Sequence, residues 1–300
     1  MDLILCHTTA DFDTLGAAVG LTRLHPGARI VLTGGCHRGV QDFLALHRDE
    51  YALIERRSVS IDQVRSLMVV DTQWRDRLGK AAEWLDESHL EITVYDHHQA
   101  DGCPSGDIPA HHWQIEAVGS TTTLIVEALQ QQQVAINSIE ATVMALGIHV
   151  DTGSLTFDHA TPRDGAALTW LMAQSANQRA IAEYVEPGLS PELQDLLPLA
   201  LERITIELQH GYAVGWVLLE VADHIRGLSS LASQLMTLTD ADVLLLATRH
   251  YSGDEERLTV IGRSHSGGYE NAVDLGALFQ PWGGGGHPRA AALSLRGEKS

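Results

Sequence analysis

The 300-residue sequence has few basic residues for its length. Lys80 and Lys299 are its only lysines, and Lys and Arg together number 20 against 39 Asp and Glu, a formal net charge of −19. A protein that follows long nucleic acid carries a basic surface, because neutralising phosphates supplies most of its affinity. The charge therefore argues against long duplex DNA as a partner.

Cysteine is also scarce. Cys6, Cys36 and Cys103 are an odd number without paired spacing, whereas disulfide frameworks and thiolate zinc sites use cysteines in regularly spaced pairs. The sequence therefore indicates neither kind of site, and we expect reduced thiols in the core or in loops.

Long apolar runs are missing as well. No stretch of the sequence approaches the roughly 20 apolar residues that cross a bilayer. The first residues lack the charged and apolar regions of a secretory signal. With 44% hydrophobic residues, the composition predicts a globular cytoplasmic protein that has no membrane segment.

The length of the chain predicts two domains, since 300 residues are about twice the commonest domain size. In the first half, short apolar runs alternate with helical patterns, which is typical of crossover units and a mainly parallel sheet. The fold class predicted for this half is α/β. The expected strands are Asp2–His7, Ala28–Leu32, Ser66–Asp71 and Glu91–Tyr95.

A helical pattern in the second half is broken by Pro187, Gly188 and Pro191, and such residues mark a boundary. The rest of the chain predicts a smaller mixed α/β domain. The expected parts are a first domain at 1–186, a helical linker at 187–209 and a second domain at 210–300. The strands expected in the second domain are Tyr212–Glu220, Val243–His250, Leu258–Arg263 and Ala290–Leu295, with helices near Leu228–Leu238 and Ala272–Phe279.

Carboxylates and histidines gather where the predicted strands and one helix end. Taken singly, an aspartate there more often caps a turn, and a lone histidine is more often packed or exposed than ligating. Open α/β sheets, however, place their sites at the carboxyl ends of the strands, and carboxylates in one crevice repel one another unless cations hold them. We therefore expect a two-metal site. The carboxylates and histidines that gather at these ends are His7, Asp11, Asp13, Asp71, Asp96, His97, His98 and Asp151.

In these motifs the sequence resembles the DHH phosphoesterase superfamily, named after the Asp-His-His found here at residues 96–98. The glycine-rich run Gly283–His287 resembles the signature of the companion domain DHHA1. The resemblance implies a mainly parallel DHH domain and a mixed α/β DHHA1 domain, joined by a helical linker, with the active site in the cleft between them. Thr9 departs from the family, which often has Asn there.

The resemblance also implies a set of metal ligands. One ion would be held by His7, Asp11 and Asp71, and the other by Asp13, Asp71, His97 and Asp151. Asp71 would bridge the two ions and take part in catalysis. His98 would be the other catalytic residue, contacting the scissile phosphate or the leaving oxygen, and Asp96 would orient a histidine. Oxygen and imidazole ligands suit Mn²⁺ best, with Mg²⁺ or Co²⁺ as alternatives.

Substrate contacts are expected in the second domain. A glycine run in isolation is more often a turn, but glycines also let a backbone approach an anion closely. Basic and hydroxyl side chains accompany this run, and the family grips its nucleotide with this domain. The expected substrate-binding residues are Arg263, Ser264, Gly284, Gly285, Gly286, His287 and Arg289. For Arg289, a surface salt bridge is an equally good interpretation.

The chemistry implied by the resemblance is hydrolysis of a phosphate ester by metal-activated water. DHHA2-bearing members are inorganic pyrophosphatases, so the DHHA1-like run argues against pyrophosphate. RecJ-like exonucleases usually carry further nucleic-acid-binding domains, of which the sequence gives no sign. We therefore expect a Mn²⁺-dependent phosphodiesterase or phosphatase that acts on short oligonucleotides or dinucleotides.

Two alternatives stay open. The enzyme could instead be a cyclic-di-AMP phosphodiesterase or a RecJ-like single-strand exonuclease. Outside enzymes, the chain could be a non-catalytic nucleotide-binding regulatory module, because some longer family chains place this domain pair ahead of CBS and tRNA nucleotidyltransferase-like domains. A homodimer is compatible with the sequence.

Overall fold

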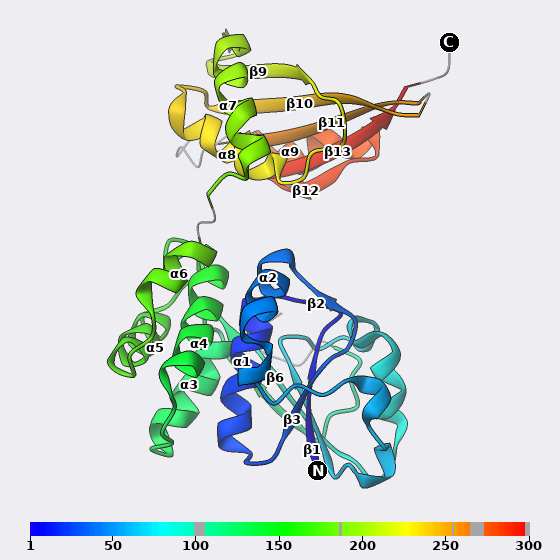
Figure 1. The fold of residues 1–300 in the computed structure, drawn as a ribbon, viewed down its shortest axis with the longest axis vertical. Coiled ribbons are helices and arrows are strands. Elements are labelled where there is room, and N and C mark those ends of the chain that lie inside the picture. The colour runs from blue at the N-terminus through cyan, green and yellow to red at the C-terminus, as the bar shows by residue number, and fades with distance from the viewer. Residues whose placement is uncertain (99–105, 186–187, 254, 265–272, 298–300) are drawn as a thin grey trace. The chain divides into compact units, whose positions relative to one another are not determined.

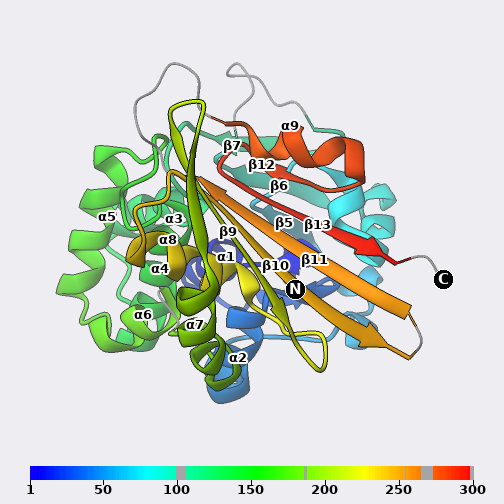
Figure 2. The same cartoon turned by 90° about the horizontal axis from the view of Figure 1, so that it is seen from above.

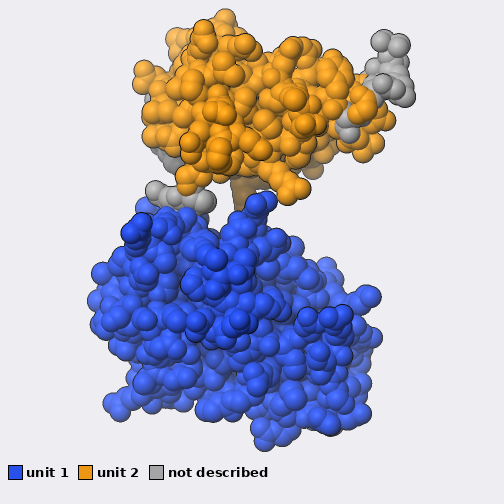
Figure 3. All heavy atoms as spheres, in the orientation of Figure 1, with its two compact units in different colours: residues 1–187 blue, residues 188–300 orange. Residues whose placement is uncertain are grey.

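The computed structural model describes residues 1–98, 106–185, 188–253, 255–264 and 273–297. The chain divides into two compact units, residues 1–187 and 188–300 (Figure 3). Cys103 and Ala272 lie outside the described residues. The reduced thiol expected at Cys103 and the helix start expected at Ala272 therefore stay predictions. No helix in the described part of the chain is both long enough and apolar enough to cross a membrane.

The first unit is built on a parallel sheet with strand order β3-β1-β5-β6-β7. Because all its strand pairs are parallel, the carboxyl ends of the strands share one edge. The strands are β1 (Asp2–Cys6), β3 (Arg29–Leu32), β5 (Ser66–Val70), β6 (Glu91–Asp96) and β7 (His112–Ile115). A short parallel pair, β2 (Thr9–Ala10) and β4 (Gly35–Cys36), lies beyond the main sheet.

Both faces of this sheet are buried, as expected for a parallel sheet. Ile4 and Cys6 of β1 pack in the core under the helices α1, α3 and α4, whereas Leu3 and Leu5 pack in a second core with the 3-10 segment η4 (Figure 1). The helical elements are α1 (Phe12–Leu24), α2 (Arg38–His47), η4 (Arg75–Asp86), α3 (Thr121–Gln131), α4 (Ser138–Asp151), α5 (Pro162–Ala173) and α6 (Gln178–Val185), with shorter 3-10 turns at Arg48–Glu50 (η1), Arg56–Ser58 (η2) and Ile61–Gln63 (η3).

Glycines bring α1 and α4 into close contact. A Cβ on Gly147 would lie 2.8 Å from the backbone oxygen of Phe12 and 3.1 Å from the Cα of Asp13, and one on Gly16 would lie 3.1 Å from the Cα of Met144. No larger residue fits at Gly147 without a backbone shift. This close approach brings the start of α1 next to the end of α4, where Asp151 lies.

The second unit contains a mixed six-stranded sheet with the order β12-β13-β11-β10-β9-β8. β9 and β10 pair in parallel, and the other pairs are antiparallel. The helices α7 and α8 lie on one side of these strands and α9 on the other (Figure 2). The elements are α7 (Pro191–Arg203), β8 (Thr205–Gln209), β9 (Tyr212–Glu220), α8 (Leu228–Leu238), β10 (Val243–Ser252), β11 (Glu255–Ser264), α9 (Leu275–Phe279), η5 (Gln280–Trp282), β12 (Gly285–His287) and β13 (Ala290–Arg296).

The predicted fold class is confirmed: a parallel α/β domain is followed by a separate, smaller mixed α/β domain. One local expectation is wrong. Residues 205–209, expected to be helical, form β8. Ile206 and Leu208 alternate with polar residues, a pattern with the period of a strand, and β9 supplies the antiparallel partner. The preceding helix α7 packs on the sheet of the second unit.

Candidate metal centre

The predicted ligands of the first unit lie at the carboxyl edge of its sheet. His7 follows β1, Asp71 follows β5, and Asp96 ends β6. Asp11 caps α1, and its carboxylate accepts a hydrogen bond from the backbone N–H of Thr14 at 3.0 Å. The structure thus brings together residues that are as far apart in sequence as His7 and Asp151.

A first group of possible ligands consists of His7, Asp11 and Asp71. His7 Nε2 is 3.4 Å from Asp71 Oδ2. The Thr14 hydroxyl lies among all three, at 2.7 Å from His7 Nε2, 2.7 Å from Asp71 Oδ2 and 3.0 Å from Asp11 Oδ1. On the other side of the ring, His7 Nδ1 faces the Thr9 N–H and Arg77, both within 3.3 Å.

A second group consists of Asp13, His97 and Asp151. His97 Nε2 is 3.0 Å from Asp151 Oδ2 and 3.9 Å from Asp13 Oδ2. The carboxylate of Asp13 is fixed by the first backbone N–H groups of α3, since those of Thr121 and Thr122 donate to it at 2.7 and 2.8 Å. A helix N-terminus favours negative charge, so α3 orients Asp13.

Asp71 lies between the two groups. Its Oδ2 faces His7, while its Oδ1 is 3.6 Å from His97 Nε2 and 3.7 Å from His98 Nδ1. Asp71 also has a left-handed backbone, with φ of 61°, a conformation that Asp and Asn tolerate better than most residues. Strained backbone of this kind gathers at functional sites, and here it presents one carboxylate to both groups.

The bonding of His97 fits a metal ligand. Its Nδ1 lies 3.1 Å from the carbonyl oxygen of Val118, and since a carbonyl only accepts, Nδ1 carries the proton. Its Nε2 is buried and lies close to three carboxylates, yet no hydrogen bond from the described residues satisfies it. A histidine that donates one ring N–H to a carbonyl and keeps the other nitrogen free is arranged as metal-binding histidines are. The residues therefore fit a cation.

The electrostatics of the centre agree with this. Burial, together with Asp71 and Asp151, raises the pKa of Asp13 well above its usual value, and burial with Asp71 raises that of Asp11. Burial acts to lower the pKa of His97, but Asp151, Asp13 and Asp71 outweigh it and raise that pKa to about 10. Burial and the neighbouring carboxylates thus oppose the charged forms of Asp11 and Asp13, whereas a cation bound among them would favour those forms.

Asp96 positions His98. Asp96 Oδ1 lies 2.8 Å from His98 Nδ1 and accepts the backbone N–H of His97 at 2.9 Å, while Oδ2 accepts from Gln73 Nε2 at 2.9 Å. The Asp96 side chain is buried, whereas that of His98 is 61% exposed. His98 therefore presents an oriented ring to the outside of the centre.

Sequence reasoning missed several residues of the centre. The clearest is Thr14, where the sequence pattern indicates only the start of a helical stretch at Thr14–Leu24. Gln73 and Arg77 gave no signal at all. Thr121 lies among Ser120, Thr121 and Thr122, which the sequence pattern indicates only as possible caps of a helix, yet its hydroxyl donates to Asp71 Oδ1 at 3.2 Å.

The expected substrate residues of the second unit gather at one end of its sheet. The strand register places Arg263 and His287 opposite Ala290, next to Arg289. Arg263 Nη2 donates to the Ser229 hydroxyl at 2.6 Å. Its Nε and the Ser264 hydroxyl are buried and have no hydrogen-bond partner among the residues that the structure describes. Burial also lowers the pKa of Arg263. His287 and Arg289 are exposed.

The glycines of this end differ in their roles. Gly286 has φ of 144°, and a Cβ there would lie 2.3 Å from the backbone oxygen of Ala290. A Cβ on Gly284 would lie 2.5 Å from the Cβ of Leu293. These two positions require glycine for packing. Gly285 has nothing within 4 Å of such a Cβ, so the space over its backbone is open.

Residues 3–148 match the family model described as the DHH family, N-terminal domain. This part of the chain belongs to the DHH family. The resemblance inferred from Asp96, His97 and His98 is confirmed, and the parallel sheet with its carboxylates and histidines is the DHH domain of the chain.

Curated relatives extend the match beyond the DHH domain. The chain is 34% identical over 99% of its length to an A-adding tRNA nucleotidyltransferase of Geobacter sulfurreducens, of which it covers 32%. It is 26% identical over 98% of its length to the cyclic-di-AMP phosphodiesterase GdpP of Geobacillus thermodenitrificans, of which it covers 44%. The chain thus spans about a third of the length of the first of these relatives.

Among solved structures, the fold is similar to that of an exopolyphosphatase-related protein from Bacteroides fragilis. The TM-score is 0.70 at 15% identity, and the match covers 99% of this chain and 88% of the other. At this level of identity, the likeness shows a shared fold.

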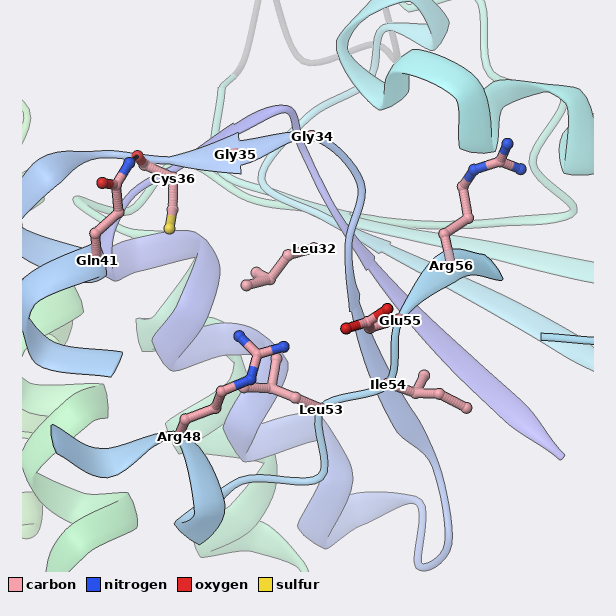
Figure 4. A pocket seen from close by; sticks show the side chains of 10 residues that line it. All are labelled: Leu32, Gly34, Gly35, Cys36, Gln41, Arg48, Leu53, Ile54, Glu55 and Arg56. Atoms are coloured by element: carbon pink, nitrogen blue, oxygen red, sulfur yellow. Dashed lines mark hydrogen bonds between the residues drawn. The ribbon is translucent and has the colours of Figure 1, made fainter. Parts of the chain in front are cut away.

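A separate cavity in the DHH domain lies beside β4 (Figure 4). Its volume is about 370 Å³. Arg48 and Cys36 reach toward it from opposite sides, whereas Arg56 points away, and Arg56 is paired with Glu83 at 3.1 Å. None of the predicted metal ligands lines this cavity, so it is distinct from the metal centre.

Proposed function

We propose that the chain is a metal-dependent phosphoesterase that hydrolyses short oligonucleotides or dinucleotides at the Asp71 centre. The observation that carries this proposal is the position of the Asp71 carboxylate. One of its oxygens lies 3.4 Å from His7 Nε2 and the other 3.6 Å from His97 Nε2. Paired metal sites of hydrolases that displace a group at phosphorus hold two ions close together, and a shared carboxylate suits such a pair.

The proposed ligands follow two of the three groups of possible ligands in the described residues, with Asp71 added to the second; the third group is Asp71, His97 and His98. His7, Asp11 and Asp71 would hold one ion, and Asp13, Asp71, His97 and Asp151 the other. Ligands of this kind suit Mn²⁺, with Mg²⁺ or Co²⁺ as alternatives. Bound there, divalent ions activate water and neutralise charge on the attacked phosphate.

His98 is the proposed side chain for contact with substrate. Asp96 fixes its Nδ1 and raises the pKa of His98, which favours the protonated ring. The exposed Nε2 can then donate a hydrogen bond to a phosphate oxygen or to the leaving oxygen. Asp96 itself acts through His98, because it is buried and already accepts several hydrogen bonds.

The proposed substrate is short because of charge. The chain carries a formal charge of −19, which repels a long polyanion, while Arg263, His287 and Arg289 supply a small basic group. In the described part of the chain, Arg263 and Ser264 each keep a buried atom without a hydrogen-bond partner, and a substrate phosphate would satisfy both. The open backbone at Gly285 fits the same role.

A second candidate function is a nucleotide-binding regulatory module of a longer protein. The observation that favours it is the relation to the A-adding tRNA nucleotidyltransferases, of which the chain covers 32 and 33%. In that case the Asp71 centre would bind metal and nucleotide without turnover.

The test is product analysis with Mn²⁺ on one panel of substrates. The panel contains pApA, a short oligoribonucleotide, 3′-phosphoadenosine-5′-phosphate, cyclic di-AMP, inorganic pyrophosphate and a long single-stranded DNA. The variant Asp71→Asn removes the shared charge, and Asp62→Asn, which changes an exposed aspartate outside the centre, is the matched control.

Rapid loss of the dinucleotide or oligoribonucleotide in the wild type and in Asp62→Asn, but not in Asp71→Asn, would support the proposal. Preference for cyclic di-AMP or for long DNA would replace the proposed substrate with the corresponding alternative. Binding of nucleotide without any turnover would contradict the enzyme and support the regulatory module.

A further inference from the structure

The second unit contains a cavity at the end of its sheet where β10 and β11 form a hairpin (Figure 2). Its volume is about 590 Å³, within the range of about 300 to 1,000 Å³ typical of small-molecule sites. The lining residues are His224, His250, Arg257, Thr259, Ser294, Leu295 and Arg296.

The polar side chains of this cavity share one face of the sheet. Arg257, Thr259 and Ile261 are spaced two residues apart along β11, so their side chains point to the same side of the sheet. Ile261 packs in the core under α7 and α8. The register then pairs His250 with Arg257, and Arg257 with Arg296. The cavity therefore lies on the α7–α8 face, where polar residues replace the apolar core.

Two polar atoms at this cavity are buried without a partner. Within the described residues, neither His250 Nδ1 nor Arg257 Nε makes a hydrogen bond, and His250 is only 5% exposed. Buried polar groups in native proteins almost always have a partner, which a ligand can supply. Two such nitrogens beside one cavity point to a ligand that accepts hydrogen bonds.

The charge at the cavity is positive in a strongly acidic chain. Arg257 is paired through Nη2 with Glu255 at 3.2 Å, which leaves its Nε free of that ion pair. Arg296 is exposed on the neighbouring strand β13. Two guanidinium groups suit an oxyanion, because their planar N–H donors match carboxylate and phosphate oxygens.

We propose that this cavity binds the phosphate group of a small molecule the size of a mononucleotide. Arg257 and Arg296 hold the anion, His250 donates from its free nitrogen, and the hydroxyls of Thr259 and Ser294 complete the set of donors. These two hydroxyl residues pair across β11 and β13. The remaining volume accommodates the rest of the molecule.

This pocket is separate from the proposed substrate end. Arg257 and Arg263 are six positions apart on β11, which corresponds to about 20 Å along a strand. The pocket therefore shares no lining residue with the proposed substrate end or with the proposed metal ligands. The experiment can use the protein without metal, so that its failure and the failure of the proposed function are distinguishable.

The test is calorimetric titration of the complete, metal-free chain with 5′-AMP, inorganic phosphate and adenosine. We expect 5′-AMP and phosphate to bind and adenosine not to bind. Tighter binding of 5′-AMP identifies a nucleotide as the source of the phosphate, and equal binding identifies the free anion. Arg257→Gln should weaken binding about tenfold or more, since it removes a charged hydrogen-bond donor.

Arg296→Gln is the second variant, and because Arg296 is exposed it keeps the test valid if Arg257→Gln does not fold. The matched control is Arg249→Gln on β10, whose guanidinium is paired with Glu220; its binding should be unchanged. Absence of binding to the wild type, binding of adenosine alone, or loss of binding in Arg263→Gln but not in Arg257→Gln or Arg296→Gln would overturn the proposal.

Discussion

In the DHH domain, the Asp13 carboxylate is 1% exposed and is gripped by two backbone N–H groups of α3. In the second unit, His287 and Arg289 are exposed, and Arg263 Nε is buried without a partner. The first region is held in place before any ligand arrives, because folding itself fixes its side chains. The second leaves donors free for a ligand. Under the proposed function, the first region would carry out the chemistry and the second would select the substrate.

The largest effect is expected from a substitution of Asp71 in the DHH domain. In Asp71→Asn, phosphoesterase activity should fall on the order of 10³-fold, since charge stabilisation of the transition state is lost. Asn tolerates the left-handed backbone that Asp71 adopts, so the fold should persist. The measurements are turnover of pApA and the circular dichroism spectrum. A variant that folds and retains near wild-type turnover would remove Asp71 from the centre.

Thr14→Val tests whether the centre depends on its surrounding hydrogen bonds. The hydroxyl of Thr14 contacts three proposed ligands, and loss of such a partner typically lowers metal affinity about 10- to 100-fold. Thr22→Val is the matched control on the same helix, because the Thr22 hydroxyl bonds to the backbone oxygen of Val19. Calorimetric titration with Mn²⁺ measures the metal affinity of the two variants. Equal affinities in the two variants would show that Thr14 does not position the ligands.

Two glycines of the Gly283–His287 run are expected to differ in role, one supporting stability and the other substrate binding. Gly286→Ala should lower the free energy of unfolding by about 1 to 3 kcal/mol, because it forces a side chain onto a backbone at φ of 144°. Gly285→Ala should change it by less than about 0.5 kcal/mol, yet raise KM by filling space open to substrate. Chemical denaturation measures the stability of each variant, and steady-state kinetics measure its KM. Similar stability losses in both variants would show that the whole run is structural.

The smallest expected effect is that of Arg263→Ala, a rise in KM for pApA of about tenfold with an unchanged Mn²⁺ content. Ser229→Ala is its control, because it removes the hydrogen bond that holds Arg263 in the protein but leaves the charge. Kinetics and metal analysis on both variants make the comparison. If Arg263→Ala loses metal, the two regions are not separate in function.

The positions of His7 and Asp71 at the ends of predicted strands were enough to expect one centre, since parallel strands end at one edge. The division of the ligands into two groups could not be derived from the residues, because it depends on the φ of Asp71 and on α3, which reaches Asp13 across more than 100 residues. Thr14 was hidden for the same reason: a helix-start signal says nothing of what its hydroxyl contacts.

In the second unit, the sequence predicted β9 and α8 with the bounds the structure has. It did not predict β8, whose formation depends on pairing with β9. The His250 and Arg257 cavity was also beyond sequence reasoning, because only the register of β10 and β11 places these two residues side by side.

Electron paramagnetic resonance of the Mn²⁺-loaded chain shows whether two metal sites share Asp71. We expect two bound Mn²⁺ per chain with a magnetically coupled spectrum, and loss of that coupling in Asp71→Asn while Asp62→Asn keeps it. A spectrum of isolated Mn²⁺ in the fully loaded wild type, or a stoichiometry of one, would contradict it.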